Sequence, residues 1–201
     1  EEKAKQGDRL AVVVSARGNA TDQLEFLLKK AANKEEYQPI FENFKKEQSE
    51  VAPYVDFKEN FTQLEKLFSG VSLLGDYSDK VKDEVLAQGE LLSIKVVSEL
   101  LKDRQIDAHS ADTRQLLKTN DNFGNAEPIG SLSRQNVVQY FEKYNGNSVP
   151  ILSGFIASNL HNETTTLGRN GSNYTAALLA NYLDAAELQN YTHVNGIYTA
   201  D

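Results

Sequence analysis

LAVVVS, residues 10–15, is a run of apolar side chains that ends on a serine. A run of this kind, without alternating polar positions, is typical of a strand that is buried on both faces. The small residues of 16–20 follow it, and then a segment in which Asp22 and Glu25 have the spacing of a capping box. That segment has apolar side chains at helical spacing, at Leu24, Leu27, Leu28 and Ala31. The pattern predicts a buried strand, a tight loop and a helix that begins near Asp22.

The same alternation continues along the chain. We expect helices over residues 78–104, 133–144 and 172–183, and strands over 106–110, 149–156, 164–167 and 188–192. Residues 35–70 show two helical stripes separated by Pro53, which we interpret as a helical insertion or lobe. Strands that alternate with helices indicate an α/β fold with a mostly parallel central sheet in a three-layer α/β/α sandwich. In that sheet, 10–15, 149–156 and 188–192 are expected to be parallel neighbours.

Composition excludes several classes of protein. The chain has 201 residues, of which 40% are hydrophobic and 25% charged, which suits one domain with its own core. It has no cysteine, hence neither a disulfide nor a thiolate site. Its net charge of −8 is the opposite of a nucleic-acid footprint, and its apolar runs are too short to span a bilayer. We therefore expect a cytoplasmic protein with no nucleic-acid or membrane partner.

The two ends of the sequence suggest that it is incomplete. There is no methionine, and the chain opens on EEKAK, which is typical of the middle of a helix. It closes on YTAD, with no terminating structure. We expect an internal fragment of a longer protein, with the fold incomplete at both ends.

The strongest local signal for a ligand is TLGRNGSNYTAA, residues 166–177, where two glycines bracket Arg169 just before a helix. A helix N-terminus attracts anions through its free N–H groups and its dipole. An arginine beside it can bind a carboxylate or phosphate with two parallel hydrogen bonds. A glycine-rich turn with a serine cap and a surface arginine explains the same residues equally well.

Two weaker signals precede it. The small-residue loop after the first strand, residues 15–21, suits close approach of backbone N–H groups to phosphates, although most strand–helix turns look similar. Gly89 stands inside a predicted helix, where glycine costs about 1 kcal/mol relative to alanine. It hints at close packing of backbone or ligand, and chance explains it nearly as well. The three histidines are dispersed and show no metal-ligand spacing.

Six segments occur in an order that resembles one known family. They are VVVSA with Thr21-Asp22, GELLS at 89–93, NDNFGNA at 120–126, GFI at 154–156, LGRNGS at 167–172 and GIYTAD at 196–201. Together they resemble the catalytic domain of the aspartokinases over nearly the whole chain. GVSLLG at 70–75 and the Arg-Asn-Gly form of the glycine motif resemble the branch that is fused to homoserine dehydrogenase.

The resemblance implies a fold and an activity. The fold would be that of the amino-acid-kinase, or carbamate-kinase-like, family. The enzyme would transfer the γ-phosphate of ATP, with Mg²⁺, to the side-chain carboxylate of L-aspartate. The product, 4-phospho-L-aspartate, begins lysine, threonine and methionine biosynthesis. The full-length protein would be a homo-oligomer.

The resemblance also implies residue roles. Aspartate would be surrounded by Thr21, Glu90, Arg169 and Ser172, with Arg169 on a substrate carboxylate and Glu90 on the α-ammonium or a supporting network. The nucleotide would be lined by Thr192, His193 and Tyr198. Asn173 stands where the family has an aspartate, and is the candidate catalytic position. His193 likewise replaces a family aspartate.

The departures from the family leave a second function open. The family's Lys-Phe-Gly-Gly-Thr-Ser strand, whose lysine neutralises the transferring phosphoryl group, is absent, so we expect this fragment alone to be inactive. The aspartate side chain is already ionised at pH 7 and needs no general base, so Asn173 is compatible with activity. An inactive homologue that senses aspartate or nucleotide is the alternative, favoured by Asn173 and His193. A kinase acting on glutamate is a further alternative. It would lack the segment at 120–126, so the presence of that segment here counts against it.

Overall fold

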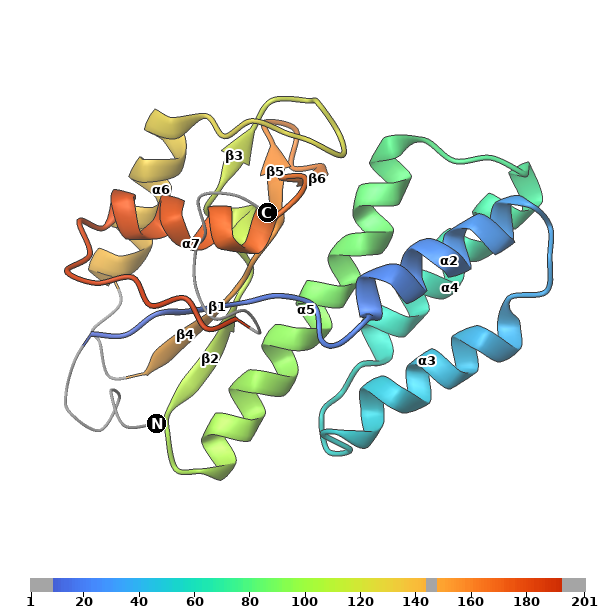
Figure 1. Ribbon diagram of the computed structural model, residues 1–201, viewed down its shortest axis with the longest axis horizontal. Coiled ribbons are helices and arrows are strands. Elements are labelled where there is room, and N and C mark those ends of the chain that lie inside the picture. Colours follow the sequence, from blue (N-terminus) through green and yellow to red (C-terminus); the bar gives the residue numbers. More distant parts are fainter. Residues whose placement is uncertain (1–8, 144–147, 193–201) are drawn as a thin grey trace.

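The computed structural model describes residues 9–143 and 148–192 (Figure 1). Its strands are β1 (Val12–Val14), β2 (Ala108–Ala111), β3 (Lys118–Thr119), β4 (Val149–Ser153), β5 (Ile156–Asn159) and β6 (Thr164–Thr166). Its α-helices are α2 (Ala20–Ala32), α3 (Gln38–Glu50), α4 (Lys58–Leu74), α5 (Asp79–Asp103), α6 (Gly130–Lys143) and α7 (Gly171–Tyr182). A short 3₁₀ helix, η1 (Thr113–Gln115), lies between β2 and β3.

The strands form two small sheets. In the first, the order is β1-β4-β2 and every pair is parallel, with Val12 opposite Ile151 and Ala108 opposite Val149. In the second, β5 pairs in parallel with β3 and antiparallel with β6. The predicted parallel pairing of the first apolar run with the run that starts at Val149 is confirmed.

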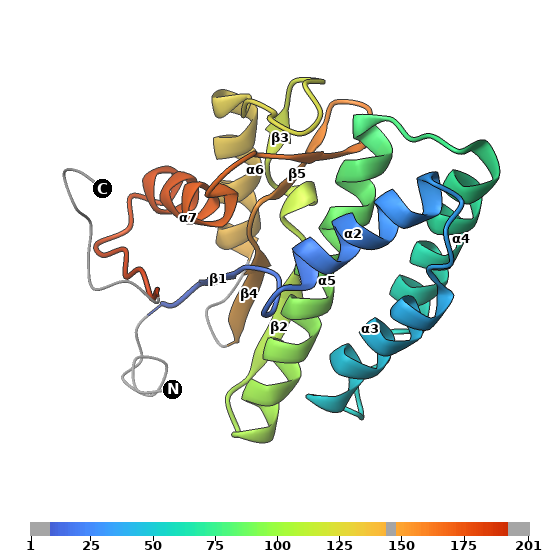
Figure 2. The same ribbon diagram turned by 45° about the vertical axis from the view of Figure 1, so that its right-hand side comes forward.

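Helices cover both faces of the first sheet (Figures 1 and 2). Successive strand residues point to opposite faces. Val12, Val14 and Ile151 accordingly pack in the cluster that contains α5 residues, whereas Val13 and Leu152 pack in the cluster that contains residues of α6 and α7. This explains why the strands are apolar runs without alternation. The chain is a mixed α/β protein with a parallel sheet.

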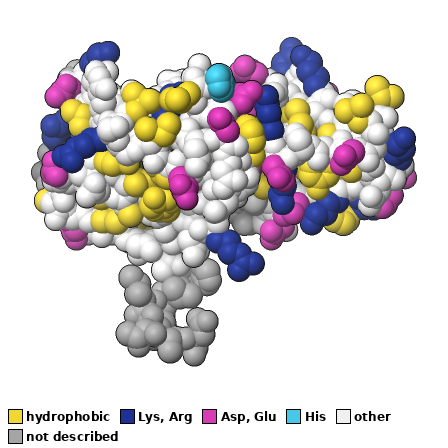
Figure 3. Space-filling view, turned by 90° about the horizontal axis from the view of Figure 1, so that it is seen from above, with side chains coloured by type: hydrophobic (Ala, Val, Ile, Leu, Met, Phe, Trp, Pro, Cys, Tyr) yellow, Lys and Arg dark blue, Asp and Glu magenta, His cyan; other side chains and the backbone are white. Residues whose placement is uncertain are grey.

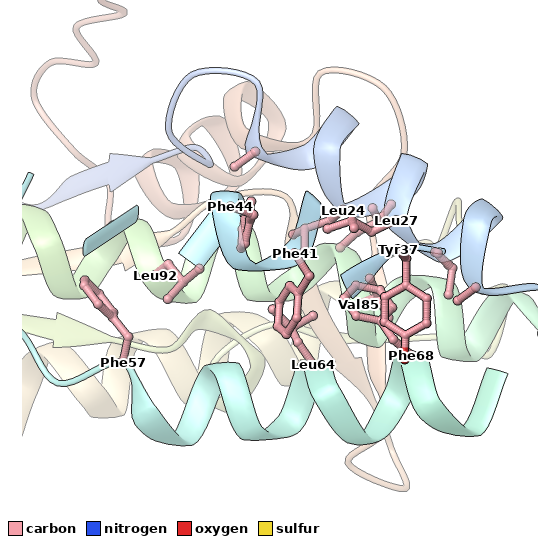
Figure 4. Close-up of a cluster of buried hydrophobic side chains, with 14 of the residues drawn as sticks. Leu24, Leu27, Tyr37, Phe41, Phe44, Phe57, Leu64, Phe68, Val85 and Leu92 are labelled. Atoms are coloured by element: carbon pink, nitrogen blue, oxygen red, sulfur yellow. The ribbon is translucent and has the colours of Figure 1, made fainter. Parts of the chain in front are cut away.

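Helices α2, α3 and α4 form a second packed region on the other side of α5 (Figure 2). Its core is aromatic (Figure 4). The Phe41 and Phe68 rings meet edge to face at 5.3 Å between centroids, and Tyr37 lies 5.7 Å from Phe68. The helical character predicted for 35–70 is confirmed. Because α5 contacts both regions, every residue from 85 to 94 is buried.

Two predicted strands are corrected. The run 149–156 is not one strand: β4 ends at Ser153, Phe155 takes a left-handed conformation with φ 65°, and the chain enters β5 of the other sheet. Ile156 thus belongs to the strand that pairs antiparallel with β6. Residues 188–192 form no strand, so they are not the third parallel neighbour. Leu188 is 52% and Tyr191 87% exposed, so the apolar side chains that suggested a strand have no core to enter.

The helix starts also differ from those predicted. Helix α2 begins at Ala20, before Asp22, and its N-cap Asn19 makes no side-chain cap hydrogen bond, so the predicted capping box is wrong. The reason is local: the Ala20 N–H already bonds to the Arg17 carbonyl in the preceding turn, at 3.1 Å. Helix α7 likewise begins at Gly171, with Asn170 in a left-handed N-cap conformation. The start of α5 is as predicted, because Ser78 caps it and accepts from the Val81 N–H.

Gly89→Ala tests the close packing of α5. A Cβ at Gly89 would lie 2.9 Å from the Cβ of Ala16, which is attached to the backbone and cannot move aside. The gain in helix propensity, about 1 kcal/mol, is therefore outweighed by overpacking, which costs typically 1–3 kcal/mol. We expect the melting temperature to fall by a few degrees (about 2–4 °C per kcal/mol for this size). Gly70→Ala in α4, where a Cβ would meet nothing within 4 Å, is the control and should not lower it.

Candidate functional site

Three elements meet at the carboxyl end of β1. The Gly154 N–H, just beyond β4, donates to the Val14 carbonyl at 2.8 Å. A Cβ at Gly154 would lie 2.6 Å from the Ser172 side chain, in the first turn of α7. The Phe155 N–H donates to Thr175 Oγ1 of the same helix at 3.1 Å. The N-terminus of α7 is therefore held against the ends of β1 and β4, as expected for a ligand site in a parallel sheet.

Glu90 reaches this corner from α5. Its Oε1 accepts from the Ala16 N–H at 3.1 Å, and among the described residues its Oε2 has no hydrogen-bond partner. The side chain belongs to a residue that is only 2% exposed. Burial, partly offset by the Ala16 hydrogen bond, raises the pKa of the Glu90 carboxyl to about 7. A buried acceptor with one oxygen unused is suited to a cationic or N–H-bearing ligand.

Thr21 lies beside the same corner. It is half-buried in the first turn of α2, and its neighbour Ala20 has its Cβ 3.9 Å from the Cβ position of Gly89. Gly89 in turn precedes Glu90. The hint of close packing at Gly89 is therefore confirmed, and the absent side chain is what lets α5 approach the β1–α2 loop.

Arg169 and Asn173 are both exposed at the start of α7. Arg169 stands between two left-handed residues, Gly168 with φ 74° and Asn170 with φ 57°. Over residues 9–143 and 148–192, it makes no hydrogen bond or ion pair. Asn173 lies in the first turn, where a negative ligand is favoured by the helix dipole. The guanidinium is thus available to an anion at this helix end.

The structure gives less support to the residues that the resemblance assigns to the nucleotide. Thr192 is exposed in an irregular segment at the end of the described residues. His193 and Tyr198 lie outside the described residues. The assignment of these three side chains to a nucleotide stays a prediction.

Asp83 is a buried acid that the sequence pattern did not single out. It is 1% exposed, and it accepts hydrogen bonds from the Gly124 N–H, the Thr166 N–H and the Thr166 hydroxyl. Burial raises the pKa of its carboxyl, and these hydrogen bonds oppose the rise. One signal was available: Asp83 and Glu90 are seven positions apart in α5 and share a helix face.

The described part of the chain offers limited means of holding a metal. It contains no group of three or more His, Asp or Glu side chains that could bind an ion.

None of the helices in the described part of the chain is both long and apolar enough to cross a bilayer. In Figure 3, acidic and basic side chains are interspersed on the face shown, without a patch of one sign.

The fold is that of an α/β protein with a parallel sheet, and the helix N-terminus and buried carboxylate at its strand ends make a candidate small-molecule site. A model of the amino acid kinase family matches residues 1–201. The chain therefore belongs to the amino acid kinase family.

Curated relatives narrow the comparison. The chain is 40% identical over 145 residues to lysine-sensitive aspartokinase 3 of Escherichia coli (strain K12), covering 69% of this chain and 32% of the relative. It is 27% identical over 212 residues to a bifunctional aspartokinase/homoserine dehydrogenase of Buchnera aphidicola, covering 98% and 26%. The chain thus spans only about a quarter to a third of these two relatives. The predicted resemblance to aspartokinases, including bifunctional ones, is confirmed.

Solved structures agree. The chain superposes with a TM-score of 0.79 and 30% identity on Escherichia coli aspartokinase III in complex with aspartate and ADP, covering 92% of this chain and 43% of that one. With the same enzyme in complex with lysine and aspartate, the TM-score is 0.80 at 32% identity, and the cover is 98% and 46%. The parallel α/β architecture described above is therefore that of aspartokinase structures.

Proposed function

We propose that the chain is part of the catalytic domain of an aspartokinase, which phosphorylates the side-chain carboxylate of L-aspartate with ATP. The observation that carries this proposal is the pairing of a buried acceptor, Glu90, with the N-terminus of α7 at one corner of the sheet. An amino acid presents an ammonium and a carboxylate, which need an acceptor and an anion site respectively. The solved relative holds both aspartate and ADP.

Each side chain of the corner then has a role. Glu90 Oε2 accepts from the α-ammonium of aspartate, and the Arg169 guanidinium binds a substrate carboxylate. Thr21 and Ser172 supply hydroxyls to the bound aspartate. The segment with Thr192, His193 and Tyr198 lines the nucleotide. Mg²⁺, if bound with ATP, would neutralise charge on the phosphates.

Phosphoryl transfer asks the protein for position and charge rather than for a base. An oxygen of the ionised aspartate side chain forms the new P–O bond as the bond from the γ-phosphorus to the β,γ-bridging oxygen breaks, and ADP leaves. The Asn173 amide hydrogen-bonds beside the reacting groups without removing a proton.

The other features belong to the same proposal: a three-layer α/β/α sandwich with residues 35–70 as a helical lobe, a homo-oligomeric full-length enzyme, and a cytoplasmic location.

The direct test supplies the full-length protein with ATP, Mg²⁺ and aspartate, and traps the acyl phosphate with hydroxylamine. We expect aspartyl hydroxamate to form with aspartate and not with glutamate. Product with glutamate alone would assign the domain to another acyl-phosphate kinase. Product with neither would favour the sensor, an inactive homologue that binds aspartate or nucleotide. The 201-residue chain alone, assayed in parallel, is expected to be inactive.

Asn173→Asp separates a working kinase from that sensor. In a working kinase that tolerates the amide, the substitution should leave the rate within about tenfold, a change of roughly 1.4 kcal/mol in the barrier. In a homologue disabled at this position, it should restore hydroxamate formation to an inactive protein. We expect the first outcome, because the reacting carboxylate needs no base. Asn181→Asp, near the other end of α7, is the matched control for added charge and should not restore activity.

A further inference from the structure

Asp83 joins two segments that are far apart in the sequence. Its Oδ2 accepts from the Gly124 N–H at 2.8 Å and from the Thr166 N–H at 3.0 Å. Its Oδ1 accepts from the Thr166 hydroxyl at 2.8 Å. One buried carboxylate on α5 thus satisfies backbone donors of both the 120–126 loop and β6. Thr166 is buried, and a buried backbone N–H group that loses its acceptor is costly, so its bond to Asp83 is a strong constraint on β6. Gly124 is exposed, and its partly buried hydrogen bond ties the 120–126 loop to the same carboxylate.

The two segments also hold each other. The Ala126 N–H donates to the Thr166 carbonyl at 2.8 Å. A Cβ at Gly168 would lie 2.3 Å from Asn125 Oδ1, so the chain just before Arg169 packs tightly against the 120–126 loop. The path from Asp83 to Arg169 is therefore short and tightly packed. It runs through Thr166, Leu167 and the left-handed Gly168, which lies against Asn125.

The same helix carries the other half of the site. Asp83 and Glu90 are two turns apart on α5, and both side chains are buried. We propose that Asp83 is a positioning residue for aspartate recognition, which sets Arg169 at a fixed place relative to Glu90 by anchoring β6 and the 120–126 loop to α5. This inference rests on the proposed function, because it assigns Arg169 and Glu90 to the two ends of one substrate. Asp83 itself touches no substrate.

Asp83→Ala in the full-length protein removes the anchor. If Arg169 moves relative to Glu90, the two residues no longer fit the two ends of aspartate. The aspartate KM should therefore rise by about tenfold, while the ATP KM stays within about threefold. Asp83→Asn should recover most of the loss. Its amide oxygen can accept from both N–H groups, and its NH₂ can donate to the Thr166 hydroxyl, which is able to accept.

Asn60→Ala is the matched control. Asn60 of α4 is a buried polar residue, 7% exposed, whose amide donates to Gln88 of α5 at 2.9 Å. It bonds to neither the 120–126 loop nor β6. This variant tests whether the loss of any polar contact to α5 raises the aspartate KM. We expect the aspartate KM of Asn60→Ala to equal that of the wild type. Amide hydrogen exchange gives a readout that needs no activity. In Asp83→Ala, exchange should accelerate at Gly124 and Thr166, whereas in Asn60→Ala these two amides should stay protected.

The outcomes are distinguishable. An aspartate-selective rise in KM with Asp83→Ala, rescued by asparagine, supports the inference. Equal rises in the KM of both substrates, or an equal rise in the aspartate KM with Asn60→Ala, would mean that Asp83 serves only general stability and would overturn the inference. Unchanged amide exchange at Gly124 and Thr166 would overturn it as well. If the wild-type protein forms no aspartyl phosphate, the proposed function fails instead. In that case direct aspartate binding, measured by calorimetry on the same variants, decides the positioning role.

Discussion

Arg169→Lys is expected to raise the aspartate KM by about tenfold to a hundredfold and to leave the ATP KM nearly unchanged. Hydrogen bonds to charged groups contribute roughly 1.5–3 kcal/mol each, and lysine keeps the charge but loses the planar fork that makes two of them. The guanidinium is exposed at the start of α7 and has no competing ion pair within the described ranges, so the variant disturbs little else. Steady-state kinetics with each substrate varied in turn measures the effect.

Arg134→Lys provides the control for this prediction. Arg134 is also exposed, in α6, and pairs with Asp184 at 3.1 Å, well outside the corner of Glu90 and Ser172. Both KM values should stay as in the wild type. Equal changes in the two KM values with Arg169→Lys, or none, would remove Arg169 from the aspartate site and leave it as a surface residue of a glycine-rich turn.

Glu90→Gln is expected to raise the aspartate KM by about a hundredfold at pH 8. Removing one partner of a buried charge pair costs about 2–5 kcal/mol, and the uncharged amide cannot replace the carboxylate opposite an ammonium. Glutamine keeps an oxygen for the Ala16 N–H, so the local backbone contact survives. Gln88→Glu is no suitable control because it adds a buried charge; Gln63→Ala, at an exposed hydrogen bond between α4 and α5, is suitable and should have no effect.

The pH dependence gives Glu90 a signature. Because burial raises the pKa of this carboxyl to about 7, only about a tenth of it is ionised at pH 6. If the ionised form binds the ammonium, the wild-type aspartate KM should fall by roughly tenfold between pH 6 and pH 8. In Glu90→Gln it should be flat across the same range. A wild-type KM that does not depend on pH would exclude Glu90 as the ammonium partner.

Stability should respond to pH in the opposite sense. The pKa of the Glu90 carboxyl is about 7 in the folded protein, above its ordinary value of 4.5, so between pH 4.5 and pH 7 the folded state holds a proton that the unfolded state has lost. Stability therefore falls as pH rises from 4.5 to 7, by an amount of about 3 kcal/mol. Glu90→Gln has no such penalty. Its urea midpoint should exceed that of the wild type at pH 8 and approach it at pH 4.5.

Much of the architecture could be read from local patterns. The valines of β1 and the apolar residues of β4 sit between helices on both faces, and that is why neither strand alternates. Leu24, Leu27 and Leu28 follow the helical period because they enter one aromatic core. Gly89 inside α5 marked a close approach that the structure contains. The apolar pattern predicts these elements correctly because each buried face packs against an apolar neighbour.

Other features depended on contacts between distant segments. The break at Phe155 moves the chain from one sheet to another. Gly154 still bonds to β1, but Phe155 takes a left-handed conformation and its N–H donates to Thr175 of α7 instead of to a strand. Leu188 and Tyr191 are apolar but find no partner strand within the described chain, so the local pattern misled. Asp83 looks like an ordinary helical acid until Gly124 and Thr166 are seen around it. Side-chain period and glycine placement are local properties, whereas the choice of partner for a backbone N–H or a carboxylate is made only when the chain has packed.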